Sequence, residues 1–137
     1  MATAGSSGTP LPKKLGIVEG STLALVGAPP GVIDGLPAGV TLTRQARGSA
    51  DVVVAFFTKR RELESRIEAL GAMVFPDGGL WIAWPKRTSG VATTVTEDVV
   101  RAVALPLGLV DNKVCAIDET WSGLRVVWRR ERRGARR

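Results

Sequence analysis

A buried, non-alternating strand in the middle of the chain constrains the fold most. Residues 52–57 read VVVAFF and lack the alternating polar positions of a strand that is half exposed to water. A helical pattern follows, and the turn sequence PDGG at 76–79 then leads into a second apolar run at 80–84. This order indicates a β-α-β unit of a parallel sheet that is covered on both faces.

Further strands are predicted on either side of this unit. An apolar run at 21–27 ends in glycine, and 40–44 alternates as expected of a strand near an edge. The central strand is expected at 51–57 and the next at 80–84. Two last strands, at about 112–118 and 123–129, flank a turn at 119–122 and form a hairpin.

Two helices are predicted between these strands. The first runs from about residue 59 to 73 with Thr58 as its N-cap, and its buried stripe is Leu63, Ile67, Leu70 and Val74. The second, at about 95–105, opens with a capping box of Thr94 and Glu97 and closes at Pro106 and Gly108. Between 29 and 34, proline can start a turn or two of helix.

These elements predict a single α/β domain over residues 15–128. Its class is a three-layer, Rossmann-like fold with a mainly parallel sheet and a C-terminal antiparallel hairpin. The N-terminus has no basic start followed by an apolar stretch, so it is not expected to be a secretory signal. Residues 1–14 are expected to be a disordered lead-in. No apolar segment approaches the roughly 20 residues that span a bilayer. A cytoplasmic location is the default expectation.

Missing residue types exclude several kinds of catalysis. The chain has no histidine and no tyrosine, so imidazole bases, histidine metal ligands and tyrosine-lysine pairs are all excluded. Its one cysteine, Cys115, lies in an apolar run and is expected to be a buried structural thiol. No metal site is predicted. An enzyme here would depend on positioning or on carboxylate, lysine and hydroxyl groups.

The positive charge of the chain is concentrated at its C-terminal end. Of the net charge of +6, residues 129–137 carry +5, so the rest is almost neutral. This arginine-rich tail could contact nucleic acid or an acidic protein, and the candidate contacts are Arg129, Arg130, Arg132 and Arg133. The simpler alternative is a solvated charged end. No helix-turn-helix pattern or interleaved aromatics support base reading.

A ligand site is predicted where the parallel strands end. In an open parallel sheet, ligands bind beyond the carboxyl ends of the strands, and three loops of this chain are expected there, at 27–31, 58–61 and 85–94. Their cations, hydroxyls and glycines suggest a small anionic or nucleotide-like ligand. The predicted ligand-binding residues are Gly27, Gly31, Lys59, Lys86, Thr88, Ser89 and Thr93. Cations and capping hydroxyls are also common at such loops without any ligand.

The hairpin turn carries two further features. Asp118 and Glu119 are adjacent, so strand alternation would separate their carboxylates, and a turn that begins with an acidic residue explains them better than acid-base catalysis. Trp121 is either an interaction contact or an aromatic that folds back over the edge of the sheet. Trp81 and Trp84 are expected on opposite faces of their strand.

The order of elements resembles a class I methyltransferase fold, chiefly in the second half of the chain. That resemblance implies S-adenosylmethionine at the loop after the first strand and an acidic residue at the end of the second. Here the loop is GAPPG (27–31), in which two prolines remove backbone N–H donors, and the second strand ends at Thr43 and Arg44. The segment before the central strand is also too short for the family's extra helix and strand.

A resemblance over residues 15–128 is more specific. The chain is similar to the small bacterial family catalogued as domain of unknown function 3052. The matching stretches, in order, are LVGAPPG (25–31), LWIAWPK (80–86), SGVAT (89–93) and DETWSGL (118–124). This resemblance implies a compact domain and no known activity.

The sequence therefore supports three functional hypotheses. The leading one is a non-catalytic or regulatory domain that binds a small anion or nucleotide-like ligand at the carboxyl edge of the sheet, with no cofactor specified. The second is a divergent S-adenosylmethionine-dependent methyltransferase, the one kind of enzyme that the pattern suggests. The third is a nucleic-acid or protein adaptor that works through the basic tail.

Overall fold

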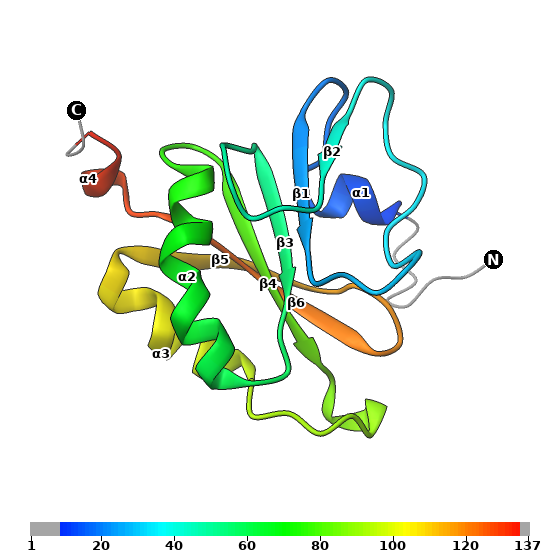
Figure 1. Ribbon diagram of the computed structural model, residues 1–137, viewed down its shortest axis with the longest axis vertical. Helices are drawn as coiled ribbons and strands as arrows, with labels where there is room; N and C mark the ends of the chain where they lie inside the picture. The colour runs from blue at the N-terminus through cyan, green and yellow to red at the C-terminus, as the bar shows by residue number, and fades with distance from the viewer. Residues whose placement is uncertain (1–8, 135–137) are drawn as a thin grey trace.

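A single mixed sheet organises the protein. The computed structural model describes residues 9–134, and within this range six strands pair in the order β2-β1-β3-β4-β6-β5 (Figure 1). Strands β1 to β4 are parallel to one another, whereas β6 is antiparallel to β4 and forms a hairpin with β5. The predicted sheet is confirmed. The bounds are β1 (Thr22–Val26), β2 (Thr41–Thr43), β3 (Val52–Phe56), β4 (Gly79–Pro85), β5 (Leu109–Ala116) and β6 (Trp121–Trp128).

Helices cover the two faces of this sheet unequally. Helices α2 (Arg60–Val74) and α3 (Glu97–Ala104) lie on one face, and the short α1 (Leu11–Lys14) lies on the other (Figure 1). On the α1 face, residues 27–40 form a series of turns that leads into the three-residue strand β2. The helical start predicted at 29–34 is reduced to one turn, closed by a hydrogen bond from the Val32 N–H to the Pro29 carbonyl. The fold thus has three layers, the third of which is mostly irregular.

Parts of the expected lead-in and of the arginine-rich tail are helical. Residues 11–14 form α1, which buries Pro12, and Leu15 directly after it is fully buried. Arg130–Arg133 form a further short helix, α4. The remainder of the predicted lead-in and tail, residues 1–8 and 135–137, lies outside the described residues.

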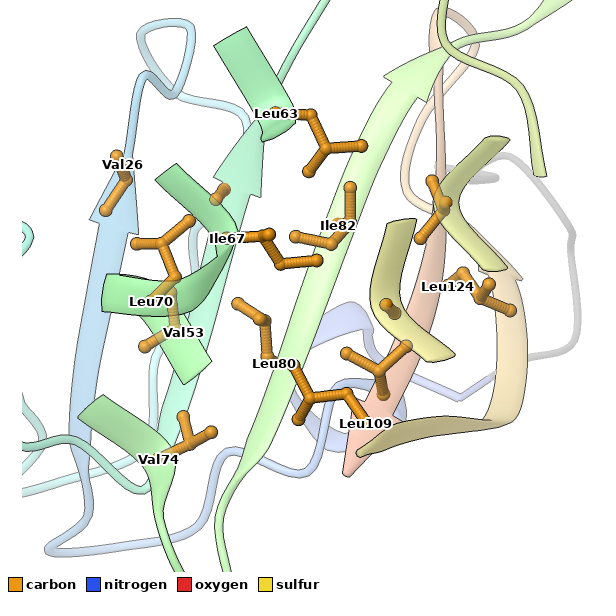
Figure 2. Packing of buried hydrophobic residues seen from close by; sticks show 14 of the residues in the cluster. Val26, Val53, Leu63, Ile67, Leu70, Val74, Leu80, Ile82, Leu109 and Leu124 are labelled. Carbon is orange, nitrogen blue, oxygen red and sulfur yellow. The ribbon is translucent and has the colours of Figure 1, made fainter. Parts of the chain in front are cut away.

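Helix α2 packs its predicted apolar stripe against the sheet. Leu63, Ile67, Leu70 and Val74 all lie in one buried cluster with side chains from β1, β3, β4 and β6 (Figure 2). Every residue of β3 is buried, because alternate side chains contact α2 on one face and the α1 layer on the other. This two-sided burial explains why the central strand is apolar without alternation.

The two tryptophans of β4 anchor opposite faces, as predicted. Trp81 is fully buried in the α1 layer, where its indole N–H donates a hydrogen bond of 2.9 Å to the Leu15 carbonyl. Trp84 packs in the α2 cluster. Trp81 therefore ties the segment before β1 to the middle of the sheet.

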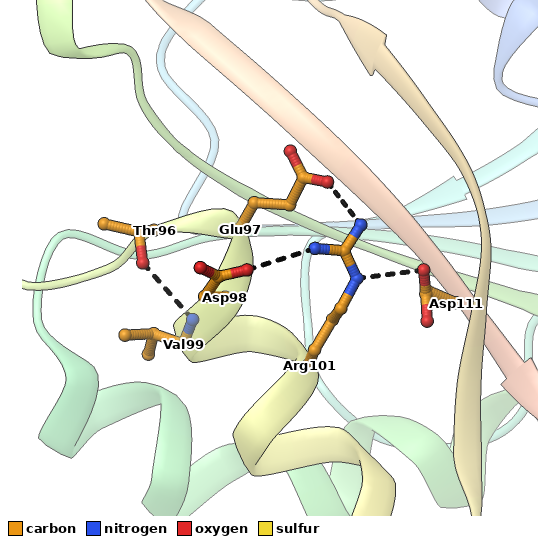
Figure 3. Close-up of polar contacts among 6 residues, drawn as sticks. All are labelled: Thr96, Glu97, Asp98, Val99, Arg101 and Asp111. Carbon is orange, nitrogen blue, oxygen red and sulfur yellow. Dashed lines mark hydrogen bonds and ion pairs between the residues drawn. The ribbon is translucent and has the colours of Figure 1, made fainter.

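Helix α3 starts two residues later than the predicted capping box. Its N-cap is Thr96, whose hydroxyl accepts a hydrogen bond from the Val99 N–H at 3.2 Å (Figure 3). Arg101 then joins the helix to β5 by pairing with Asp111 at 3.0 Å, besides Asp98 and Glu97 on its own helix. The hydrogen bonds to Asp111 and then Glu97 raise the pKa of the Arg101 guanidinium. These pairs are solvent-accessible, so each contributes little to stability.

The closing hairpin is longer than predicted and its turn is earlier. Strand β5 starts at Leu109, three residues before the expected position, and β6 starts at Trp121. The turn between them is organised by Asp118, whose Oδ1 accepts hydrogen bonds of 2.8 Å from the N–H groups of Thr120 and Trp121. The interpretation of Asp118 as a turn residue is confirmed.

Between residues 9 and 134, no helix has both the length and the hydropathy to cross a bilayer.

Candidate functional site

The carboxyl ends of β1, β3 and β4 meet at one edge of the sheet. Because these three strands are parallel and adjacent, the loops that follow them leave the sheet side by side. Gly27 follows β1, Lys59 follows β3, and Lys86 follows β4. Gly27 and Lys59 are exposed, and Lys86 is partly buried. The structure thus brings the three predicted loops to the same edge.

The strand order reverses between β1 and β3: β2 is added on one side of this pair and β4 on the other. From β1 the chain moves outward to β2 along the α1 face, whereas from β3 it continues through α2 on the opposite face to β4. This divergence is the topological switch point, the usual place for a ligand in an open α/β sheet. At Gly27 the backbone has φ 68°, and a Cβ there would lie 3.2 Å from the Phe56 carbonyl oxygen. Glycine lets the two strand ends approach closely at the switch point.

Two of the predicted hydroxyls hold the loop after β4 in shape. The Thr93 hydroxyl donates to the Thr58 carbonyl at 2.8 Å and accepts from the Val95 N–H at 3.0 Å. Ser89, in the 3₁₀ turn η1 (Arg87–Ser89), donates to the Lys86 carbonyl at 2.7 Å and accepts from the Val91 N–H at 3.1 Å. Thr88 is exposed. Ser89 and Thr93 therefore have a structural role that is independent of any ligand.

The N-terminus of α2 is capped from a distant part of the chain. The N-cap position is Lys59, not Thr58, and no side chain of its own turn caps the helix. Instead the Thr94 hydroxyl accepts a hydrogen bond of 2.7 Å from the Arg60 N–H, and the Thr94 N–H donates to the Thr58 carbonyl at 2.9 Å. These two hydrogen bonds therefore attach the loop after β4 to the segment between β3 and α2. One of the N–H groups that an anion could have used at this helix is already bonded within the protein.

Replacing Thr94 should loosen this end of α2. We expect Thr94→Ala to lower the free energy of unfolding by about 1 kcal/mol, since the Arg60 N–H loses its acceptor. Thr88→Ala is the matched control, an exposed threonine on the same loop that should change stability by less than about 0.5 kcal/mol. Urea denaturation of both variants measures the difference. Equal effects would show that the cap does not contribute.

A hollow of about 430 Å³ lies beside this edge, between α1, residues 31–35 and the β5–β6 turn. Of the seven predicted ligand-binding residues, Gly31 lines it. Its charged residues are Asp34, Asp118 and Glu119 against Lys14, so its lining is acidic rather than basic. No sequence pattern predicts this hollow, because it joins three segments that are far apart in the chain.

Trp121 folds back over the α1 face of the sheet. Its ring meets Phe56 edge to face, with 5.1 Å between the ring centroids and an angle of 87° between the planes. Trp121 pairs with Pro85 in the β4–β6 ladder, and the Lys86 N–H donates to the Thr120 carbonyl at 2.7 Å. This half-buried aromatic thus lies next to the loops of the switch point.

The basic C-terminal residues are partly tied to the domain. Arg133 donates through Nε to the Trp128 carbonyl at 3.0 Å, and Arg132 donates to the Leu107 carbonyl at 3.3 Å while its side chain lies over Gly108. Arg129 and Arg130 are exposed. An interaction of this segment with nucleic acid or an acidic protein stays a prediction.

Cys115 is only partly buried, although burial raises the pKa of its thiol. Its neighbours Lys14 and Lys113 oppose that increase. Among the described residues, no group of three or more cysteine, aspartate or glutamate side chains is placed to hold a metal ion.

Comparison with solved structures identifies the fold. A magnesium protoporphyrin IX methyltransferase from Synechocystis PCC 6803, solved with bound SAM, has a TM-score of 0.60 at 14% identity, covering 86% of this chain and 74% of that one. A SAM-dependent methyltransferase from Aquifex aeolicus has a TM-score of 0.58 at 16% identity, covering 83% and 85%. A ribosomal protein L11 methylase from Lactobacillus delbrueckii subsp. bulgaricus has a TM-score of 0.53 at 12% identity, covering 92% and 74%.

At these identities the likeness concerns the fold alone. The chain has a methyltransferase-like Rossmann fold, as the order of its elements suggested. No family model matches the chain, and neither does any curated protein. Membership in the family of domain of unknown function 3052 therefore stays a prediction.

Proposed function

We propose that this protein is a binding domain that takes a small anionic or nucleotide-like ligand at the switch point and does not catalyse methyl transfer. The observation that carries the proposal is the divergence of the chain between β1 and β3, with Gly27 at the first strand end and Lys59 just beyond the second. Lys86 adds a second cation from the neighbouring loop. Positive charges at such an edge favour ligands with phosphate or carboxylate groups.

The loops around the switch point argue against S-adenosylmethionine chemistry. The segment after β1 contains Pro29 and Pro30, which have no N–H to donate, and it continues as turns rather than as a helix. Strand β2 has only three residues and is followed by Arg44, which cannot accept hydrogen bonds from ribose hydroxyls. These departures from the methyltransferase pattern support a site that binds a ligand other than S-adenosylmethionine.

A divergent S-adenosylmethionine-dependent methyltransferase is the second candidate, and the shared fold favours it. The similar proteins from Synechocystis and Aquifex aeolicus are methyltransferases, and the first was solved with SAM bound. If this chain binds SAM, the ribose and methionine groups must be held by residues other than those that the family resemblance implies.

Calorimetric titration separates the two candidates. The ligands are AMP, ATP, inorganic phosphate, S-adenosylmethionine and S-adenosylhomocysteine. The proposal predicts binding of a nucleotide, weakened at least about tenfold by Lys86→Ala, because a charged hydrogen bond is lost. Lys113→Ala is the matched control, since Lys113 is an exposed lysine on β5, at the far edge of the sheet, and should leave the affinity unchanged.

The same titrations can contradict the proposal. Binding of S-adenosylmethionine without any nucleotide binding would favour the methyltransferase. Absence of heat with all five compounds would contradict both candidates, and an equal loss in the Lys86 and Lys113 variants would indicate a non-specific charge effect.

A further inference from the structure

A second hollow lies at the opposite edge of the sheet, where the parallel strands begin. It has a volume of about 700 Å³, within the range of small-molecule sites. Residues of three segments line it: 16–22 up to the start of β1, 49–52 up to the start of β3, and 73–78 from the end of α2 to the residue before β4. One side chain from the body of the sheet, that of Arg125 on β6, completes the lining. This amino-edge hollow is separate from the switch point.

The Arg125 side chain packs where Gly79 has no side chain of its own. Arg125 pairs with Trp81 in the β4–β6 ladder, and its guanidinium lies against Gly79, at the start of β4. A Cβ at position 79 would be 2.7 Å from the Arg125 Cζ, so any larger residue there would have to displace the guanidinium. The side chain is therefore packed into the wall of the hollow, in contrast to a freely solvated surface arginine.

The guanidinium of Arg125 is a half-buried cation. Burial, followed by the nearby positive charge of Arg133, lowers the pKa of its guanidinium. Among the ion pairs of residues 9–134, none includes Arg125. A half-buried guanidinium without a carboxylate is a binding group for an anion, and its planar donors suit a carboxylate.

The rest of the hollow carries the opposite charge. Glu19, Asp51 and Asp77 line it and are exposed. Asp51 already accepts a hydrogen bond of 2.9 Å from the Thr22 N–H, whereas Glu19 and Asp77 have no ion-pair partner among the described residues. None of these carboxylates lies within ion-pair distance of the Arg125 guanidinium. The hollow is therefore bipolar, with a cation in its wall and carboxylates elsewhere in its lining.

We propose that the amino-edge hollow binds a small zwitterion, such as a free amino acid or a dipeptide, with its carboxylate on Arg125 and its ammonium group facing Glu19 and Asp77. A simple anion suits the hollow less well, because three carboxylates would repel it. A simple cation leaves Arg125 unpaired. A ligand that carries both charges satisfies both ends.

Nuclear magnetic resonance titration of the ¹⁵N-labelled full chain tests this proposal. The probes are the twenty amino acids added singly, followed by the N-acetyl and the amide derivatives of the one that binds best. We expect shifts of the Asp77, Gly78 and Gly79 amides and of the Arg125 Nε–H. Each derivative lacks one of the two charges and should bind at least about tenfold more weakly.

Variants separate the two ends of the hollow. Arg125→Met and Asp77→Asn should each weaken binding at least about tenfold, whereas Arg66→Met, an exposed arginine on α2, is the matched control and should not. Asp77 lies in an exposed turn, so its variant keeps the test valid even if Arg125→Met fails to fold. No shifts at millimolar amino acid, shifts confined to the loops of the switch point, or equal binding of acetate would overturn the proposal. None of these results affects the nucleotide titrations at the carboxyl edge.

Discussion

Replacing Trp81 by alanine should lower the free energy of unfolding by about 4 kcal/mol, the largest single effect that we expect in this domain. Trp81 is fully buried, and removing its indole leaves a cavity between β4 and the α1 layer. It also leaves the Leu15 carbonyl without its hydrogen-bond donor. Domains of this size have a total stability of about 5–15 kcal/mol, so urea denaturation should show a much earlier transition.

Phenylalanine substitutions separate the cavity from the hydrogen bond. Trp81→Phe keeps most of the ring volume but removes the N–H, and we expect it to cost about 2 kcal/mol. Trp84→Phe is the matched control on the same strand, because Trp84 packs in the α2 cluster and its indole N–H has no hydrogen-bond partner among residues 9–134. If both phenylalanine variants lost the same stability, the bond to Leu15 would contribute nothing beyond packing.

Alanine at Gly78 should cost about 3 kcal/mol, far more than alanine at the next residue. A Cβ on Gly78 would lie 2.7 Å from the Asp51 carbonyl oxygen and 3.0 Å from the Val74 carbonyl oxygen. Both oxygens are held by hydrogen bonds, from the N–H groups of Gly79 and Gly78 respectively, so neither can move without breaking the junction of α2, β3 and β4. Because the crowded atoms belong to a backbone that cannot shift, the loss of stability is expected at the upper end of the range usual for overpacking.

Gly79→Ala is the matched comparison for this prediction. Its new methyl group would meet the Arg125 guanidinium, the far end of a flexible side chain that can swing away, so we expect a cost of about 1 kcal/mol. Thermal and urea denaturation of the two variants give the ranking. A Gly79 variant less stable than the Gly78 variant would mean that Arg125 is more rigidly held than the backbone at Gly78.

Much of the fold could be predicted from local pattern. The run at 52–57 identified the central strand because a strand buried on both faces has no polar positions, and Leu63, Ile67, Leu70 and Val74 identified the buried face of α2 by their spacing. The caps were predicted wrongly for a non-local reason. A threonine followed three residues later by glutamate is a local signature, but Thr94 bonds to Arg60, 34 residues earlier, and Thr96 caps α3 instead.

The candidate site was less accessible to sequence reasoning. Parallel topology correctly placed the loops after β1, β3 and β4 at one edge, because that follows from strand direction alone. Whether Ser89 and Thr93 are free to meet a ligand depends on loop hydrogen bonds that no spacing rule predicts. Arg125 was not among the predicted site residues, because its packing on Gly79 depends on the antiparallel register of β4 and β6.

The location of nucleotide-induced shifts on the ¹⁵N-labelled protein shows most directly whether the switch point binds a ligand. If the switch point between β1 and β3 is the ligand site, titration with AMP should move the amide signals of Gly27, Thr58 and Lys86 together, at a common affinity. Movement of amides only around Arg125 or in α4, with those three unchanged at saturation, would contradict it.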